Sequence, residues 1–210
     1  NPLSQALLEV AKMCPPAFSL NVTLNRKHEI TGVFAGDLEE AHQVGIDFVR
    51  KTAMQEVPEP YDIVITTNSG YPLDQNLYQT VKGMSAAARI VKEGGVIIAA
   101  AECSDGYPNH GNYRDILLDS PSMCHFLEHV KEEKYNITDR WQVQIQAMVQ
   151  VKADVYLYTH GLTDEEVKAA HLKPCHDISA LVRELVDERG GSARICVLPE
   201  GPMTIPYVKE

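Results

Sequence analysis

The chain has 210 residues and a formal net charge of −10, from 29 acidic and 19 basic side chains. This acidic balance, without a basic run to offset it, argues against a nucleic acid or an anionic membrane surface as partner. Hydrophobic residues make up 44% of the sequence, yet no apolar run approaches the roughly 18 residues of a membrane-spanning helix. No secretory leader pattern is visible. We therefore expect a globular cytoplasmic protein with one domain over residues 1–210.

The N-terminal part of the sequence predicts a helix, a hairpin and a second helix. An apolar stripe with helical spacing runs through residues 2–13, which predicts an amphipathic helix that packs on a sheet. Apolar and polar residues alternate over 18–24 and again over 30–35, with a polar turn between them. This pattern predicts a β-hairpin with one buried face. A helix capped by Asp37 should follow, to about Thr52.

The middle of the chain predicts a β-α-β unit. A short apolar run at 63–65 stops at a polar turn, 66–70, as expected of a buried strand. We expect Asp74 to cap the following helix and Gly94-Gly95 to end it, before a second buried strand at 96–101.

The crossover in such a unit is right-handed and its strands are parallel, so the turn at 68–74 should lie beside the loop at 101–105. Both belong to the carboxyl edge of the sheet, where open α/β sheets bind their ligands. The loop continues to Tyr113 through Gly, Pro and Asn residues and His110. It is a candidate wall of a binding pocket.

The helix of this unit carries an unusual polar group. Gln75, Gln79 and Lys82 recur at i, i+4 and i+7, with Tyr78 beside them. An amide and an ammonium three residues apart can together bind a carboxylate. We expect Gln79 and Lys82 to project into the mouth above the sheet. From spacing alone, a solvated helix face is the alternative.

The rest of the chain continues the alternation of helices and strands. Helices are expected over 122–134 and over 138–151, the second with Trp141, Ile145, Met148 and Val149 on one side. Further expected elements are a strand at 155–158, a helix at 163–170 with a Thr163–Glu166 capping box, a helix at 177–188 and a strand at 194–198. The fold class is therefore α/β, a Rossmann-like, mostly parallel sheet flanked by helices, with an N-terminal antiparallel β-hairpin.

Metal ligands and nucleotide motifs are not indicated. His125 and His129 have a spacing that can hold a metal, but no H-E-x-x-H pattern and no third ligand is evident, which favours a structural or surface role. The five cysteines are scattered and lack C-x-x-C spacing. No G-x-G-x-x-G follows the strand. We expect no metal site in this chain.

A longer motif points to a family. Residues 70–84 read G-Y-P-L-D-Q-N-L-Y-Q-T-V-K-G-M. This closely resembles the signature of the lactate racemase family, the nickel-pincer-nucleotide 2-hydroxyacid racemases and epimerases. The likeness extends to 21–37, to D-R-W at 139–141 and to V-L-P-E-G at 197–201, and so covers almost the whole chain as the family's carboxy-terminal half. One departure is Asn68-Ser69-Gly70, where members often show Asn-Gly-Gly.

The resemblance implies a C-terminal α/β domain of a longer two-domain isomerase. By that likeness, Gln79 and Lys82 hold the substrate carboxylate, while Tyr78 and Trp141 line the site near the cofactor. The cofactor, a nickel-pincer nucleotide, would be held mainly by the N-terminal domain, which also supplies the histidine bases. The chain opens on Asn1 rather than Met, which fits a cut inside a longer protein. We expect the isolated chain to be inactive.

Two functions stay open at this stage. The first is the C-terminal domain of a 2-hydroxyacid racemase or epimerase. Its partners would be a small 2-hydroxyacid or sugar acid, its own N-terminal domain and a possible second copy of the chain. The second is a non-catalytic α/β module that binds a small anion in a regulatory role.

Overall fold

The structure is a computed structural model that describes residues 2–14, 18–25 and 27–209. Its contacts divide the chain into two compact units, residues 1–54 and 55–210. The expectation of one C-terminal domain over residues 1–210 stays a prediction. Among the described residues, no helix has both the length and the apolar character needed to cross a membrane.

The first unit holds a helix, a hairpin and a second helix. They are α1 (Pro2–Met13), β1 (Ser19–Leu24), β2 (Ile30–Gly36) and α2 (Leu38–Ala53). The strands pair antiparallel, with Val22 opposite Val33. As predicted, Asp37 caps α2, and its side chain accepts from the backbone N–H groups of Glu39 and Glu40. The predicted hairpin and its following helix are therefore confirmed.

The predicted burial of this unit is wrong. The apolar residues that alternate along β1 are exposed, Leu20 and Leu24 by more than half and Val22 by 46%, and the stripe of α1 is exposed as well. The helix α2 packs on the hairpin through Phe34 and Phe48, whose ring centroids lie 5.4 Å apart. Alternation therefore identifies an apolar face correctly but does not say that this unit buries it.

The second unit is built on a five-stranded parallel sheet with the strand order β7-β6-β5-β4-β8. A separate two-stranded sheet pairs β3 with β9. The strands are β3 (Met54–Val57), β4 (Tyr61–Thr67), β5 (Val91–Ala100), β6 (Asp154–Tyr158), β7 (Lys173–Cys175), β8 (Ile195–Leu198) and β9 (Ile205–Val208). The parallel sheet confirms the predicted fold class.

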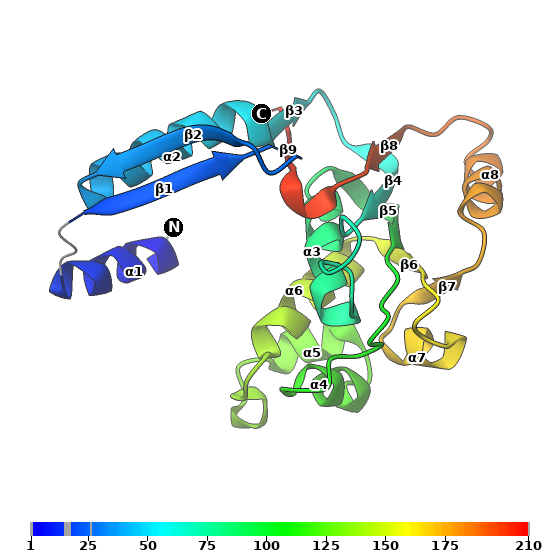
Figure 1. Ribbon diagram of the computed structural model, residues 1–210. Helices are drawn as coiled ribbons and strands as arrows, with labels where there is room; N and C mark the ends of the chain where they lie inside the picture. The colour runs from blue at the N-terminus through cyan, green and yellow to red at the C-terminus, as the bar shows by residue number, and fades with distance from the viewer. Residues whose placement is uncertain (1, 15–17, 26, 210) are drawn as a thin grey trace. The chain divides into compact units, whose positions relative to one another are not determined.

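Helices cover both faces of this sheet, with α3 and α6 on one side and α8 on the other (Figure 1). Alternate residues of each strand serve the two cores: Val64 and Ile97 pack toward α3, whereas Ile63 and Ile98 pack toward α8. The helical elements are α3 (Leu77–Ala88), α4 (Tyr113–Asp119), α5 (Met123–His129), η1 (Glu133–Tyr135), α6 (Arg140–Lys152), α7 (Asp164–Ala169), α8 (Ile178–Glu188) and η2 (Gly201–Met203).

Both ends of α3 differ from the prediction. Asn76, and not Asp74, is the cap, and it accepts from the backbone N–H of Gln79 at 3.1 Å. The helix ends at Ala88, and Gly94-Gly95 lie inside β5. Gly94 has a φ of +69°, and the register with β4 shifts at this point. The two glycines therefore form an irregularity in the strand and not a helix stop.

The predicted apolar side of α6 is mostly exposed, and of its four residues only Val149 is buried. Trp141 is 51% exposed, and Ile145 and Met148 also face outward. The inward face carries Gln142, Gln146 and Gln150, which donate to main-chain carbonyls of Tyr78 (2.7 Å), Ala170 (3.0 Å) and Ala170 (3.3 Å), respectively. Both hydrogen bonds of buried amides and apolar contacts therefore hold this helix in place.

A glycine sets the distance between α3 and β4. A Cβ atom at Gly83 would lie 2.6 Å from the carbonyl oxygen of Thr67. The backbone N–H of Gly83 donates to Asn68 Oδ1 at 3.0 Å, and Thr66 Oγ1 donates to the carbonyl of Gly83 at 3.3 Å. The helix therefore rests directly on the end of the strand.

We expect Gly83→Ala to lower the free energy of unfolding by about 1–2 kcal/mol. Alanine gains roughly 1 kcal/mol of helix propensity, but the clash with a main-chain oxygen costs more. Denaturant unfolding measures the difference, with Ser85→Ala on the same helix as a control that meets no such clash. A Gly83→Ala variant more stable than wild type would contradict the close approach.

Candidate functional site

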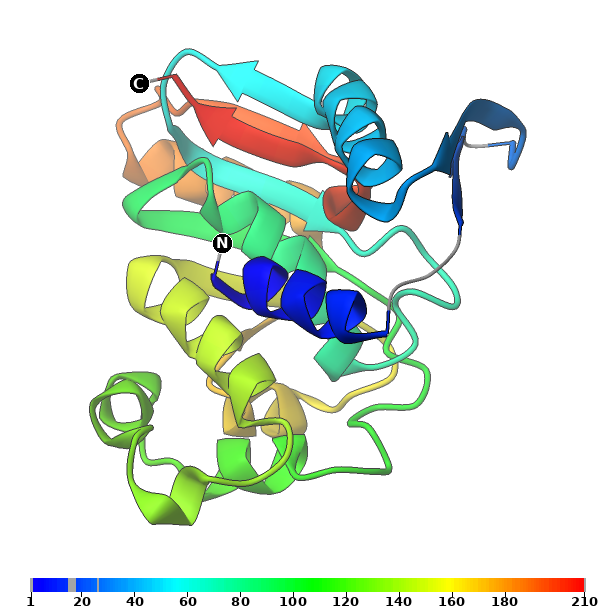
Figure 2. The same cartoon turned by 90° about the vertical axis from the view of Figure 1, so that its left-hand side faces the viewer.

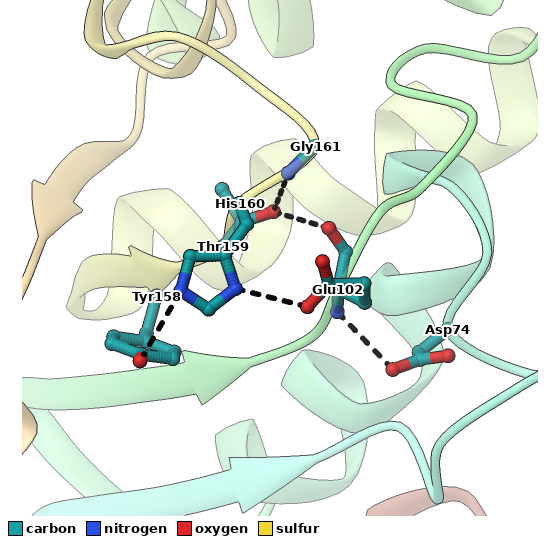
Figure 3. A network of polar contacts seen from close by, with 6 residues as sticks. All are labelled: Asp74, Glu102, Tyr158, Thr159, His160 and Gly161. Atoms are coloured by element: carbon teal, nitrogen blue, oxygen red, sulfur yellow. Dashed lines mark hydrogen bonds and ion pairs between the residues drawn. The ribbon is translucent and has the colours of Figure 1, made fainter.

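The carboxyl edge of the sheet carries the first candidate site, and the loops meet there as predicted. Asp74 Oδ2 accepts from the backbone N–H of Glu102 at 3.1 Å, and the N–H of Cys103 donates to the carbonyl of Asp74 at 2.9 Å. Figure 3 shows this contact continuing through Glu102 to His160, whose Nδ1 lies 3.1 Å from Glu102 Oε2. The side chain of Asp74 therefore joins the two loops instead of capping α3.

A pocket of about 390 Å³ opens at this edge. Two buried atoms on its lining residues, Asp74 Oδ1 and Ser69 Oγ, make no hydrogen bond to any residue that the structure describes. Ser69 also has a φ of +66°, in the left-handed region that glycine favours. The edge is acidic, since Glu102 and Glu200 line the pocket too. It suits a cation or a hydroxyl donor better than a carboxylate.

The outer face of α3 carries the second candidate site. Lys82 Nζ donates to Gln79 Oε1 at 2.6 Å, so the predicted amide and ammonium form one pair. Lys82 is exposed and Gln79 is half-buried. The expectation that they point into the mouth above the sheet is wrong. Lys82 lines a different pocket, of about 260 Å³, between α3, α6 and η2.

The lining of this second pocket was not predicted from the sequence. It includes Arg89, seven residues after Lys82, as well as Gln142 of α6 and the main chain around Gly201. The spacing of two turns between the cations was the available signal, because it places both on one helix face. No acidic residue occurs in α3. This face therefore concentrates positive charge on a strongly acidic chain.

The two predicted aromatic residues have different surroundings. The Tyr78 ring packs edge-on against Tyr113, with centroids 5.3 Å apart, and is partly buried against the core. Burial raises the pKa of Tyr113 well above its ordinary value, so its hydroxyl stays a donor, to Gln146. Trp141 stands next to Gln142, which donates to the Tyr78 carbonyl, and its side chain is half exposed. Of these two residues, Trp141 presents the larger aromatic surface to solvent.

Figure 2 shows α3 (green) and α6 (yellow-green) side by side on one face of the sheet. The structure thus brings Gln79 and Lys82 together and places Trp141 on the neighbouring helix.

The profile of the lactate racemase C-terminal domain matches residues 57–205. The chain belongs to this family.

Known lactate racemases resemble the chain over nearly its whole length. The lactate racemase of Thermoanaerobacterium thermosaccharolyticum is 37% identical over 208 residues, which are 98% of this chain and 48% of that protein. The lactate racemase of Lactiplantibacillus plantarum is 35% identical, over 96% of this chain and 47% of its own length. The chain therefore spans about half the length of these relatives and is homologous to the C-terminal half of lactate racemase.

Solved structures agree with this assignment. The apoprotein structure of the lactate racemase from T. thermosaccharolyticum superposes with a TM-score of 0.90 at 35% identity, covering 100% of this chain and 50% of that one. A protein from Thermotoga maritima gives a TM-score of 0.60 at 13% identity, covering 91% and 49%, and shares the fold alone. The fold predicted from the lactate racemase signature is thereby confirmed.

The serine that departs from the Asn-Gly-Gly pattern of this family provides a test at the sheet edge. We expect Ser69→Gly to raise the free energy of unfolding by about 1 kcal/mol, because glycine adopts a positive φ without the penalty of a side chain. It also removes a buried hydroxyl without a partner among the described residues. Thermal and denaturant unfolding measure the change, and Ser85→Gly, inside α3, should have the opposite sign.

Proposed function

We propose that this chain is the C-terminal half of a 2-hydroxyacid racemase or epimerase that depends on a nickel-pincer nucleotide, and that Gln79 and Lys82 bind the substrate carboxylate. The observation that carries the proposal is the contact of 2.6 Å between these two side chains on the exposed face of α3. It occurs in a chain that is 37% identical to a lactate racemase. The substrate class follows from the relatives, which are both lactate racemases, and lactate is a 2-hydroxyacid.

The hydrogen bond between the pair determines what it presents to a ligand. An ammonium has only donors, so Gln79 must offer its carbonyl oxygen to Lys82. The amide nitrogen of Gln79 is thereby left with two N–H groups, and Lys82 keeps further N–H groups of its own. Both residues then present donors, and one of them is charged. A carboxylate accepts such charge-assisted bonds from two neighbouring groups at once.

The surroundings of the pair favour the same ligand. Arg89 adds a second cation to the pocket that Lys82 lines, and α3 contributes no carboxylate that would compete for them. Ile145 of α6 provides an apolar wall in the same pocket. A small acid with a short apolar substituent matches this combination of cationic and apolar surface.

The donors on this face fit a substrate and not the metal. Ammonium, amide nitrogen and guanidinium are not nickel ligands, whereas imidazole and thiolate are. The nickel-pincer nucleotide, when bound, supplies the acceptor for the hydride that leaves carbon 2. Gln79 and Lys82 would hold the carboxylate in one position while that exchange takes place. Trp141 would cover the cofactor from α6, and the N-terminal domain would hold it.

The first unit supports an N-terminal domain as partner. Apolar side chains on α1 and on the hairpin, among them Leu7, Val10, Leu20 and Val33, are mostly exposed. Apolar faces of this extent are ordinarily covered in a folded protein. The relatives are about twice as long as this chain. We propose that the N-terminal half of the enzyme, which precedes these residues in the relatives, packs on these apolar faces.

Substitution of Lys82 in the full-length enzyme with its cofactor tests the carboxylate assignment. We expect Lys82→Ala to lower kcat/KM for a 2-hydroxyacid by roughly 10- to 100-fold, the loss of one charge-assisted hydrogen bond. Gln79→Glu should be at least as damaging, because it neutralises Lys82 and repels the substrate. Lys168→Ala, at an exposed position of α7, is the control. Racemisation at the wild-type rate in Lys82→Ala would refute the residue-level assignment.

The 210-residue chain alone should neither carry a nickel nucleotide nor racemise any 2-hydroxyacid. The reason is that the ligands and bases implied by the resemblance belong to the other half of the enzyme. Mass spectrometry and metal analysis of the chelator-treated chain, with chiral detection of product, check this. Stoichiometric nickel nucleotide on the chain, or turnover by it, would contradict the proposal that the other half of the enzyme holds the cofactor and the bases.

Binding of a small carboxylate without any activity in the full-length protein would favour the anion-binding module.

A further inference from the structure

The helix α5 carries a cluster that the proposed reaction does not use. In the part of the chain that the structure describes, one group of three side chains has metal-ligating atoms within 4.8 Å of one another, and it consists of His125, Glu128 and His129. The spacing i, i+3 and i+4 places all three on one helix face. The opposite face buries Met123 and Phe126 in the core. The cluster is therefore held on a packed helix and directed outward.

The imidazole of His129 is already oriented. Its Nδ1 lies 2.8 Å from the main-chain oxygen of His125. A carbonyl oxygen can only accept, so Nδ1 carries the hydrogen and Nε2 presents its lone pair. A backbone carbonyl is one of the groups that commonly fix the tautomer of a metal-binding histidine in this way. Half-burial of both histidines limits their rotation further.

The two imidazole rings lie close together, with centroids 4.0 Å apart and planes inclined by 33°. The third group, Glu128, adds a carboxylate that the sequence pattern alone did not indicate as a ligand. Glu132 also approaches, at 3.9 Å from His129 Nε2, but Lys134 holds it at 3.2 Å. The ligand set is thus two imidazoles and one carboxylate.

We propose that His125, Glu128 and His129 form a surface site for one divalent transition-metal ion of the class that prefers imidazole, Zn²⁺, Ni²⁺ or Cu²⁺. Two nitrogen ligands and a single carboxylate suit these ions, whereas Mg²⁺ and Ca²⁺ prefer sites made of oxygen atoms. Three protein ligands leave coordination positions to water, so the site exchanges its ion with solvent. Binding joins consecutive turns of a seven-residue helix and stabilises it.

Isothermal titration of the chelator-treated chain with Zn²⁺, and separately with Ni²⁺, tests the site. We expect one ion to bind per chain. His125→Gln and His129→Gln should each weaken binding by at least about tenfold, and Glu128→Gln by less. In His176→Gln, the matched control, a histidine with a single carboxylate partner is removed and affinity should not change. Far-UV circular dichroism confirms that each variant is folded.

A second measurement separates the site from neighbouring groups. Saturating Zn²⁺ should raise the Tm of the wild-type chain but not of His129→Gln, because an ion that binds only the folded state stabilises it. Cys124→Ser should behave as wild type, although this exposed thiol is adjacent to His125. The proposal is overturned if wild type binds neither ion, if both histidine variants bind as wild type does, or if Cys124→Ser abolishes binding.

Discussion

The contact between α3 and the end of β4 determines where the proposed binding residues lie. Gly83 lets the helix approach the main chain of Thr67 closely, and Asn68 and Thr66 hydrogen-bond to the backbone of the same glycine. One side of α3 is thereby fixed on the sheet. Gln79 lies one turn before Gly83 and is half-buried, whereas Lys82 is exposed, so the position of the helix on the strand sets where both side chains project. Any larger residue at 83 would move them together.

Much of the fold followed from periodicity and caps. The parallel sheet was predictable from short apolar runs separated by helical patterns, and the caps Asp37 and Thr163 were recognisable because their side-chain oxygens serve nearby N–H groups. Asp74 misled the prediction. It is an equally good cap by type, but the loop after β5 offers it a backbone N–H from Glu102, a contact that only the tertiary structure creates.

Burial was harder to predict than secondary structure. The alternating residues of β1 and the stripe of α1 are apolar without being covered in the structure. A pattern specifies which face avoids water, but the surface that covers it can belong to another part of the protein. For the candidate site, the amide and ammonium of α3 were predictable as a pair, since both are on one helix. Arg89 was missed although its spacing from Lys82 places both on one helix face. The pocket wall from η2 was not predictable, because the chain returns there only after more than a hundred residues.

The three glutamines on the inner face of α6 have a mechanical consequence. An apolar face tolerates rotation of a helix about its axis, since one aliphatic contact replaces another at small cost. Amides that point at particular carbonyl oxygens do not, because a roll by a single position would break every one of these bonds at once. Gln142, the neighbour of Trp141 in the sequence, therefore fixes the direction in which Trp141 projects. The exposed apolar residues of α6 are not needed to hold the helix in place, so their identity can be set by the surface that they contact.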